Sequence, residues 1–156
     1  MKTLYVYFTR TSRTESAVLT LKRLMGGDER IVRIRPSLGY GGPFGFLRAL
    51  GSSIFGKGPV KLLSGDPVEF GDYDRVIVAT PVWAGKAPPP VRTFLQAHTG
   101  AKSTAYLALC GGGSCEKLFD ELDQLTGCKR VAALALDGMK GNAEHEIEGF
   151  IRQISG

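Results

Sequence analysis

The stretch VIVATPVWAGKAPPPVRTFL, residues 76–95, covers most of one strand–loop–helix unit. The strand, Arg75–Thr80, is short and rich in β-branched residues, which is typical of a buried strand. Prolines 88–90 then open a helix, because proline suits a first turn whose N–H groups have no partner within the helix. Val91, Phe94 and Leu95 recur at helical spacing and predict the buried face of that helix.

The same alternation of strand and helix extends from this unit toward both ends of the chain. Further strands are expected at Leu4–Phe8, Arg30–Arg35, Thr104–Cys110 and Arg130–Leu136, and further helices at Thr14–Met25, at Glu116–Thr126 and around Ile147–Ile154. Such alternation predicts one doubly wound α/β domain over residues 1–156, with a parallel sheet covered by helices on both faces. The arginines of residues 30–35 favour a position at a sheet edge. Residues 36–71 form an irregular connection with a possible short helix near 46–55.

The composition excludes several functional classes. The chain has 156 residues, 43% of them hydrophobic, and no apolar run approaches the roughly 20 residues that span a bilayer. The apolar run near the start is short and lacks a cleavage site, so we expect a cytoplasmic protein. The net charge of +5 comes without a dense basic run or a nucleic-acid motif. We therefore expect neither a membrane span nor a nucleic-acid partner.

The cysteines and histidines give no metal-site pattern. There is no CxxC pair, and His98 and His145 lie far apart in the sequence. We therefore expect no metal. An odd number of cysteines also argues against a disulfide framework. Cys110 and Cys115 are five positions apart and are either free thiols or a redox dithiol.

Ligands of open α/β sheets bind at the carboxyl ends of the strands, so the loops that leave the strands are the candidate site. The first loop feeds a helix N-terminus, and its hydroxyls and arginines favour a phosphate monoester. The alternative is a solvated turn in which Ser12 or Thr14 caps the helix. The loop contains neither a Walker motif nor a dinucleotide fingerprint. Its residues are Thr9, Arg10, Thr11, Ser12, Arg13 and Thr14.

Two further loops complete the candidate site. The loop after the strand at Arg75–Thr80 carries the one tryptophan of the chain, which can form a stacking wall for a flat aromatic ligand or be an ordinary half-buried residue. The loop after the next strand has three successive glycines, which permit a close approach to the backbone or simply form a flexible turn. The candidate residues of these loops are Thr80, Pro81, Val82, Trp83, Ala84 and Gly85, and Cys110, Gly111, Gly112, Gly113 and Ser114.

Three segments of the chain resemble the flavodoxin family. YFTRTSRT (7–14) resembles its phosphate loop, residues 76–95 resemble its second flavin loop with the helix that follows, and CGGGSCEKLFDEL (110–122) resembles its third loop. The resemblance implies a five-stranded sheet in the order 2-1-3-4-5 and an FMN cofactor. The chain departs from the family in its basic charge, in Arg13 and in Ser12, which stands where glycine is usual. A positive φ at position 12 would strain the serine.

The resemblance also implies roles for the candidate residues. The first loop would hold the phosphate, the second would pack on the isoalloxazine with the Ala84–Gly85 peptide near N5, and the third would line the pyrimidine edge. No catalytic side chain is needed, because FMN supplies the redox chemistry. The protein would then be an electron carrier with a redox partner protein. The alternatives are an NAD(P)H-dependent reductase of quinones or other small molecules, with residues 36–55 covering the substrate, and a binding module that has lost FMN.

Overall fold

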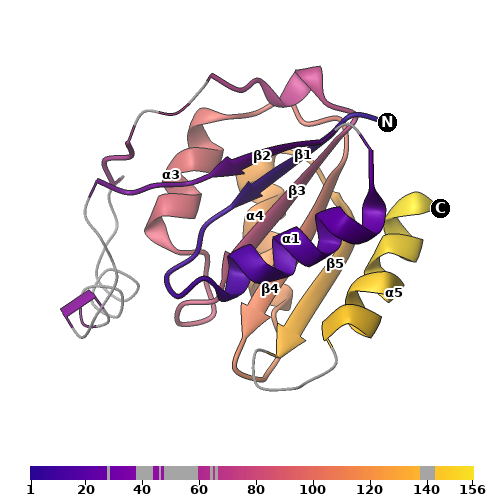
Figure 1. The fold of residues 1–156 in the computed structure, drawn as a ribbon. Coiled ribbons are helices and arrows are strands. Elements are labelled where there is room, and N and C mark those ends of the chain that lie inside the picture. The colour runs from indigo at the N-terminus through magenta and orange to yellow at the C-terminus, as the bar shows by residue number, and fades with distance from the viewer. Residues whose placement is uncertain are drawn as a thin grey trace.

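The computed structural model describes residues 1–27, 29–37, 44, 45, 47, 60–63, 65, 67–137 and 143–156. Its elements, shown in Figure 1, are β1 (Thr3–Tyr7), α1 (Arg13–Met25), β2 (Glu29–Arg33), the 3-10 turn η1 (Phe70–Asp72), β3 (Arg75–Pro81), α3 (Pro89–Ala97), β4 (Thr104–Cys110), α4 (Glu116–Thr126), β5 (Arg130–Asp137) and α5 (Ala143–Ser155). The predicted strands and helices are confirmed, with ends that differ by at most two residues, except that α5 begins at Ala143, four residues before the first apolar residue predicted for it. Of the helix expected near 46–55, every residue except 47 lies outside the described part of the chain.

The sheet has five parallel strands in the order β2-β1-β3-β4-β5. This order confirms the prediction, including the position of the arginine-rich strand at an edge. β1 and β3 lie inside the sheet and are almost wholly buried, as their apolar sequences require. No helix within the described ranges is long and apolar enough to cross a membrane.

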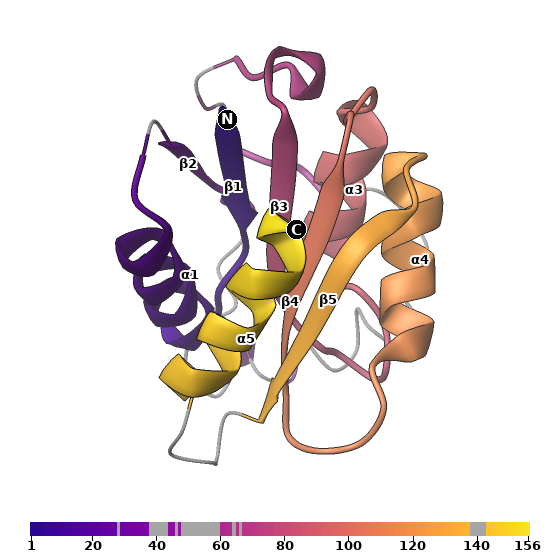
Figure 2. The ribbon, with the colours of Figure 1, turned by 90° about the vertical axis from the view of Figure 1, so that its right-hand side faces the viewer.

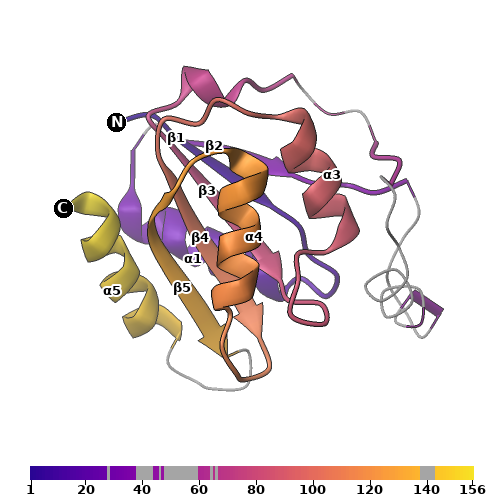
Figure 3. The same ribbon diagram turned by 180° about the vertical axis from the view of Figure 1, so that it is seen from behind.

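Side chains alternate between two apolar clusters, one on each face of the sheet. Tyr5 and Ile77 point to the face covered by α1 and α5, where Val18 and Phe150 pack against them. The opposite face carries α3 and α4, as Figures 2 and 3 show. The helices thus form two layers that hold the sheet between them and leave its carboxyl edge to the loops.

Candidate functional site

The three candidate loops emerge side by side at the carboxyl edge of the sheet, at the lower end of the strands in Figure 1. β1, β3 and β4 are neighbours, and their hydrogen bonding continues past the strand ends. The Phe8 N–H donates to the Ala79 carbonyl over 3.1 Å, and the Val82 N–H donates to the Leu109 carbonyl over 3.1 Å. Parallel pairing therefore brings together three loops that are far apart in sequence.

The first loop presents the N-terminus of α1. The hydrogen-bond ladder of the helix begins with the Ser16 N–H, which donates to the Ser12 carbonyl over 3.0 Å. The N–H groups of residues 13–15 consequently have no acceptor within the helix, and they form the positive end of its dipole. Ser12 stands at the N-cap position of the helix, but its side chain makes no cap hydrogen bond, and Thr14 lies buried inside the first turn.

The acidic residue of this first turn, Glu15, contacts side chains of β1 and β2. The Tyr7 hydroxyl donates to Glu15 Oε1 over 2.7 Å, and Arg33 Nη1 lies 3.7 Å from the same oxygen. Burial, followed by this hydrogen bond, raises the pKa of Tyr7 to about 12, so the tyrosine remains a donor. The Glu15 carboxylate is thus engaged by Tyr7 and Arg33. Arg13 is exposed beside the N–H groups of residues 13–15, which have no acceptor within the helix.

Ser12 adopts a left-handed conformation, with φ 65° and ψ −1°. This conformation costs a non-glycine residue about 1 kcal/mol. Because the serine side chain makes no cap, we expect Ser12→Gly to raise the free energy of unfolding by about 0.5–1 kcal/mol, measured by urea denaturation. The matched control is Ser16→Gly, one turn later in ordinary helix, which should lower it by a similar amount. A destabilised Ser12→Gly protein would contradict this account.

The second loop is a tight turn from Trp83 to Lys86. Each of these two residues donates its N–H to the carbonyl of the other over 3.0 Å. Ala84 and Gly85, between them, have positive φ values of 50° and 74°, as a type I′ turn requires. Glu121 of α4 fastens the end of the loop, because its Oε2 accepts the Ala87 N–H over 2.9 Å. The turn is therefore held rigidly.

Trp83 is half-buried and meets the ring of Phe8 edge-on, with centroids 5.5 Å apart and planes at 79°. This contact joins the second loop to the end of β1. Beside the turn lies a hollow of about 490 Å³, lined by Ala84, Gly85, Lys86, Lys117 and Glu121. The tryptophan is thus packed on one edge, while its loop faces open space next to α4.

The third loop exposes the backbone of its glycines. Gly112 and Gly113 have φ values of 108° and 92°, which side-chain-bearing residues rarely adopt. A Cβ built on Gly111, Gly112 or Gly113 would meet no described atom within 4 Å. The backbone conformation thus favours glycine at 112 and 113, and the room beside all three glycines, as far as the described residues show, suits the approach of a ligand to the backbone.

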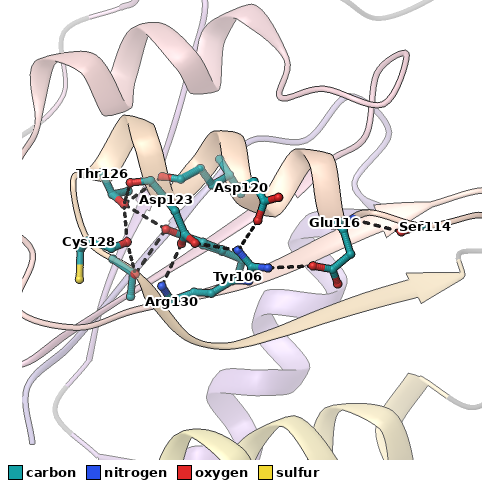
Figure 4. Close-up of polar contacts among 10 residues, drawn as sticks. Tyr106, Ser114, Glu116, Asp120, Asp123, Thr126, Cys128 and Arg130 are labelled. Carbon is teal, nitrogen blue, oxygen red and sulfur yellow. Dashed lines mark hydrogen bonds and ion pairs between the residues drawn. The ribbon is translucent and has the colours of Figure 1, made fainter.

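A polar cluster fixes α4, the helix that follows this loop (Figure 4). Ser114 Oγ accepts the Glu116 N–H over 3.4 Å, and the Glu116 carboxylate lies 2.8 Å from Arg130. Arg130 also contacts Asp120 at 3.0 Å and Asp123 at 2.7 Å. The arginine of β5 therefore ties α4 to the sheet at three positions along the helix.

The predicted site residues differ in how far they are exposed to solvent. Thr9, Thr14 and Thr80 are buried, and the Thr80 hydroxyl donates to the Pro81 carbonyl over 2.9 Å. The exposed residues of the three loops are Thr11, Ser12, Arg13, Ala84, Gly85, Gly111, Gly112, Gly113 and Ser114, with Arg10, Pro81, Val82, Trp83 and Cys110 half-buried. Residues 9–14, 80–88 and 110–115 contain no aspartate or glutamate. The edge is thus polar and suited to an anion.

Sequence reasoning missed three features of this site. Glu121 and Arg130 act through partners distant in sequence, and no local pattern points to them. The positive φ of Ala84 also went unpredicted, although the adjacent Gly85 was a signal for a turn of this type.

Comparisons with known proteins place the chain by its fold. No protein-family model and no curated protein matches the sequence. A proposed flavoprotein from Bacteroides uniformis is 22% identical with a TM-score of 0.80, over 97% of both chains. A flavoprotein in complex with FMN from Lactobacillus acidophilus is 16% identical with a TM-score of 0.70, over 96% of this chain and 98% of its own. An FMN-bound flavodoxin mutant from Fusobacterium nucleatum is 13% identical with a TM-score of 0.57, over 99% of this chain and 95% of its own. These likenesses confirm the predicted flavodoxin-like fold.

Proposed function

We propose that this chain of flavodoxin-like fold binds one FMN across its three loops and transfers electrons through it. The observation that carries the proposal is the N-terminus of α1, whose N–H groups lack helical partners and lie next to Arg13 at the same edge as the other two loops. A phosphate group satisfies such N–H groups and is favoured by the helix dipole. The FMN complex of the Lactobacillus acidophilus flavoprotein, which matches nearly the whole chain, supports the choice of ligand.

The residues present fit this cofactor. The loop at 9–14 offers hydroxyls, two arginines and the N-terminus of α1 to the phosphate. The turn at 83–86 supplies an indole and the Ala84–Gly85 peptide for the ring, and the exposed backbone at 111–114 supplies N–H groups for its polar edge. Bound FMN supplies the redox chemistry, while the protein supplies binding and electrostatics. No acid–base side chain is required for electron transfer.

Trp83 provides the first test of this arrangement. We expect FMN to quench the tryptophan emission strongly, because Trp83 is the one tryptophan and lies in the proposed ring-binding loop. The measurement is a fluorescence titration of the purified protein with FMN. Unchanged emission together with flavin binding shown by gel filtration would contradict the placement of Trp83 at the ring.

We further propose that the protein works in the cytoplasm and passes electrons to a partner protein. Cys110, Cys115 and Cys128 are all free thiols, which fits a reducing compartment. An assay of the FMN-loaded protein separates this role from that of a reductase. We expect no oxidation of NAD(P)H, and steady oxidation would instead assign the protein to the flavin-dependent reductases.

A further inference from the structure

The outer side of β2 has no strand beside it among the residues that the structure describes. β2 lies at the edge of the sheet (Figure 2), and in the described part of the chain residues 29–33 pair with β1 alone. The Ile34 N–H donates to the Tyr7 carbonyl over 2.7 Å, and the backbone groups of successive strand residues point to opposite sides. Ile31 and Arg33 therefore direct their N–H and C=O groups away from the sheet.

A segment of this chain already pairs with the continuation of that edge. The Leu63 N–H donates to the Arg35 carbonyl over 2.7 Å, and the Ser37 N–H donates to the Lys61 carbonyl over 2.8 Å. Residues 61–63 thus run antiparallel beside the chain just beyond β2. The backbone on this side is therefore able to accept an extended segment.

A hollow of about 300 Å³ lies along the same edge. Its lining comes from β2 and from the segment that follows residues 61–63, namely Arg30, Ile31, Val32, Arg33, Arg35, Leu63 and Gly65. The Leu63 side chain is 56% exposed, so the lining includes apolar surface that a bound segment would cover. The hollow thus gives room beside the outward-facing backbone of β2.

The charge of this edge is strongly positive. Four cationic residues belong to it and to the segment beside it: Arg30, Arg33, Arg35 and Lys61. The nearby carboxylates are engaged, because Glu29 accepts the Tyr5 hydroxyl over 2.8 Å and Glu15 accepts the Tyr7 hydroxyl over 2.7 Å. Glu15 also lies 3.7 Å from Arg33 and offsets part of one cation. A second copy of this chain would set arginines against arginines, which like-charge repulsion disfavours.

We propose that the outer edge of β2 binds an extended acidic segment of another protein, which adds to the five-stranded sheet as one more strand. Its backbone pairs with the outward groups of Ile31 and Arg33, and its carboxylates contact Arg33 and Arg35. Main-chain hydrogen bonds of this kind accept any sequence, whereas the arginines select for aspartate and glutamate. The edge therefore distinguishes partners by charge.

The test is a fluorescence anisotropy titration of a short labelled peptide of alternating glutamate and threonine with the whole wild-type protein. We expect saturable binding that weakens as salt is added, and no binding of the matched peptide of lysine and threonine. An acidic peptide with every backbone nitrogen methylated keeps its charge but loses its N–H donors, and it should bind at least about tenfold more weakly. Equal binding of the methylated peptide, or no binding of the first peptide, would overturn the proposal.

Paired variants locate the peptide on the protein. The double variant Arg33→Gln, Arg35→Gln should weaken binding of the acidic peptide about tenfold. The matched double variant Arg23→Gln, Arg152→Gln removes two exposed arginines from α1 and α5 and should change binding by less than about twofold. Equal losses in both double variants would show general attraction to a basic chain and overturn the proposal.

A single variant keeps the test independent of the contact between Arg33 and Glu15. Arg35→Gln alone, at an exposed side chain, should weaken binding of the acidic peptide about threefold, while the urea denaturation midpoint stays that of the wild type. Unchanged binding by this variant would contradict the placement of the peptide at β2. None of these titrations needs FMN, so their outcome is independent of the proposed function.

Discussion

Riboflavin, which lacks the phosphate of FMN, is expected to bind this protein roughly a thousandfold more weakly than FMN. The N–H groups of residues 13–15 have no acceptors within α1, and Arg13 is exposed beside them. Charge-assisted hydrogen bonds contribute about 1.5–3 kcal/mol each, so two of them account for a factor on this order. Isothermal titration calorimetry with both ligands measures the difference. Equal affinities would contradict the assignment of the first loop to phosphate.

Two charge variants test whether the preference for FMN over riboflavin arises from the first loop, residues 9–14. Arg13→Gln should weaken FMN binding at least about tenfold and leave riboflavin binding unchanged, because only FMN carries the phosphate. Lys22→Gln removes the same charge from the last turn of the same helix and should change neither affinity by more than about twofold, because exposed charges that far apart are screened. If both variants weakened FMN equally, general attraction by the basic chain would explain the preference.

Arg130→Ala is expected to lower the free energy of unfolding by about 2 kcal/mol. The Arg130 side chain is 20% exposed and contacts Glu116, Asp120 and Asp123. The Asp123 side chain is also 20% exposed, so this ion pair is largely shielded from solvent. Arg130 also lies over the Phe119 ring at 5.6 Å. Loss of one partner lowers the free energy of unfolding by about 3–5 kcal/mol for a buried ion pair and by less than about 1 kcal/mol for an exposed one. Because this cluster is partly buried, the expected loss lies between these two values. Urea denaturation measures the change.

Arg23→Ala is the matched control for this prediction. Arg23 forms an ion pair of 2.7 Å with Glu144, but the two side chains are 62% and 57% exposed. Because solvent screens this pair, Arg23→Ala should lower the free energy of unfolding by less than about 1 kcal/mol. A cost for Arg130→Ala no larger than that for Arg23→Ala would show that the cluster in Figure 4 contributes little to holding α4 beside the third loop.

Local patterns in the sequence were sufficient to predict the elements and the loops between them. The arginines of residues 30–35 predicted an edge strand, and β2 lies at the edge. The proline run predicted a helix start, and α3 begins at Pro89. The order of the strands came instead from the family resemblance, because strand periodicity carries no information about which neighbour a strand will pair with.

Long-range contacts limited the prediction of the site. Phe8 was expected inside the first strand, but β1 ends at Tyr7, although the Phe8 N–H still donates to the Ala79 carbonyl. The contacts of Trp83 with Phe8 and of Ala87 with Glu121 join residues more than 30 positions apart. Such contacts depend on how the layers pack, which neither composition nor spacing encodes. The site residues themselves remain predictions until a ligand is bound.

The most direct test of the central claim is the visible absorbance spectrum of the purified protein with and without added FMN, followed by gel filtration. We expect the flavin band to shift and sharpen on mixing, and one FMN per chain to elute with the protein. A spectrum equal to the sum of its components, with all flavin eluting as free FMN, would contradict the account. The protein would then be a flavodoxin-like fold whose three loops serve some other ligand.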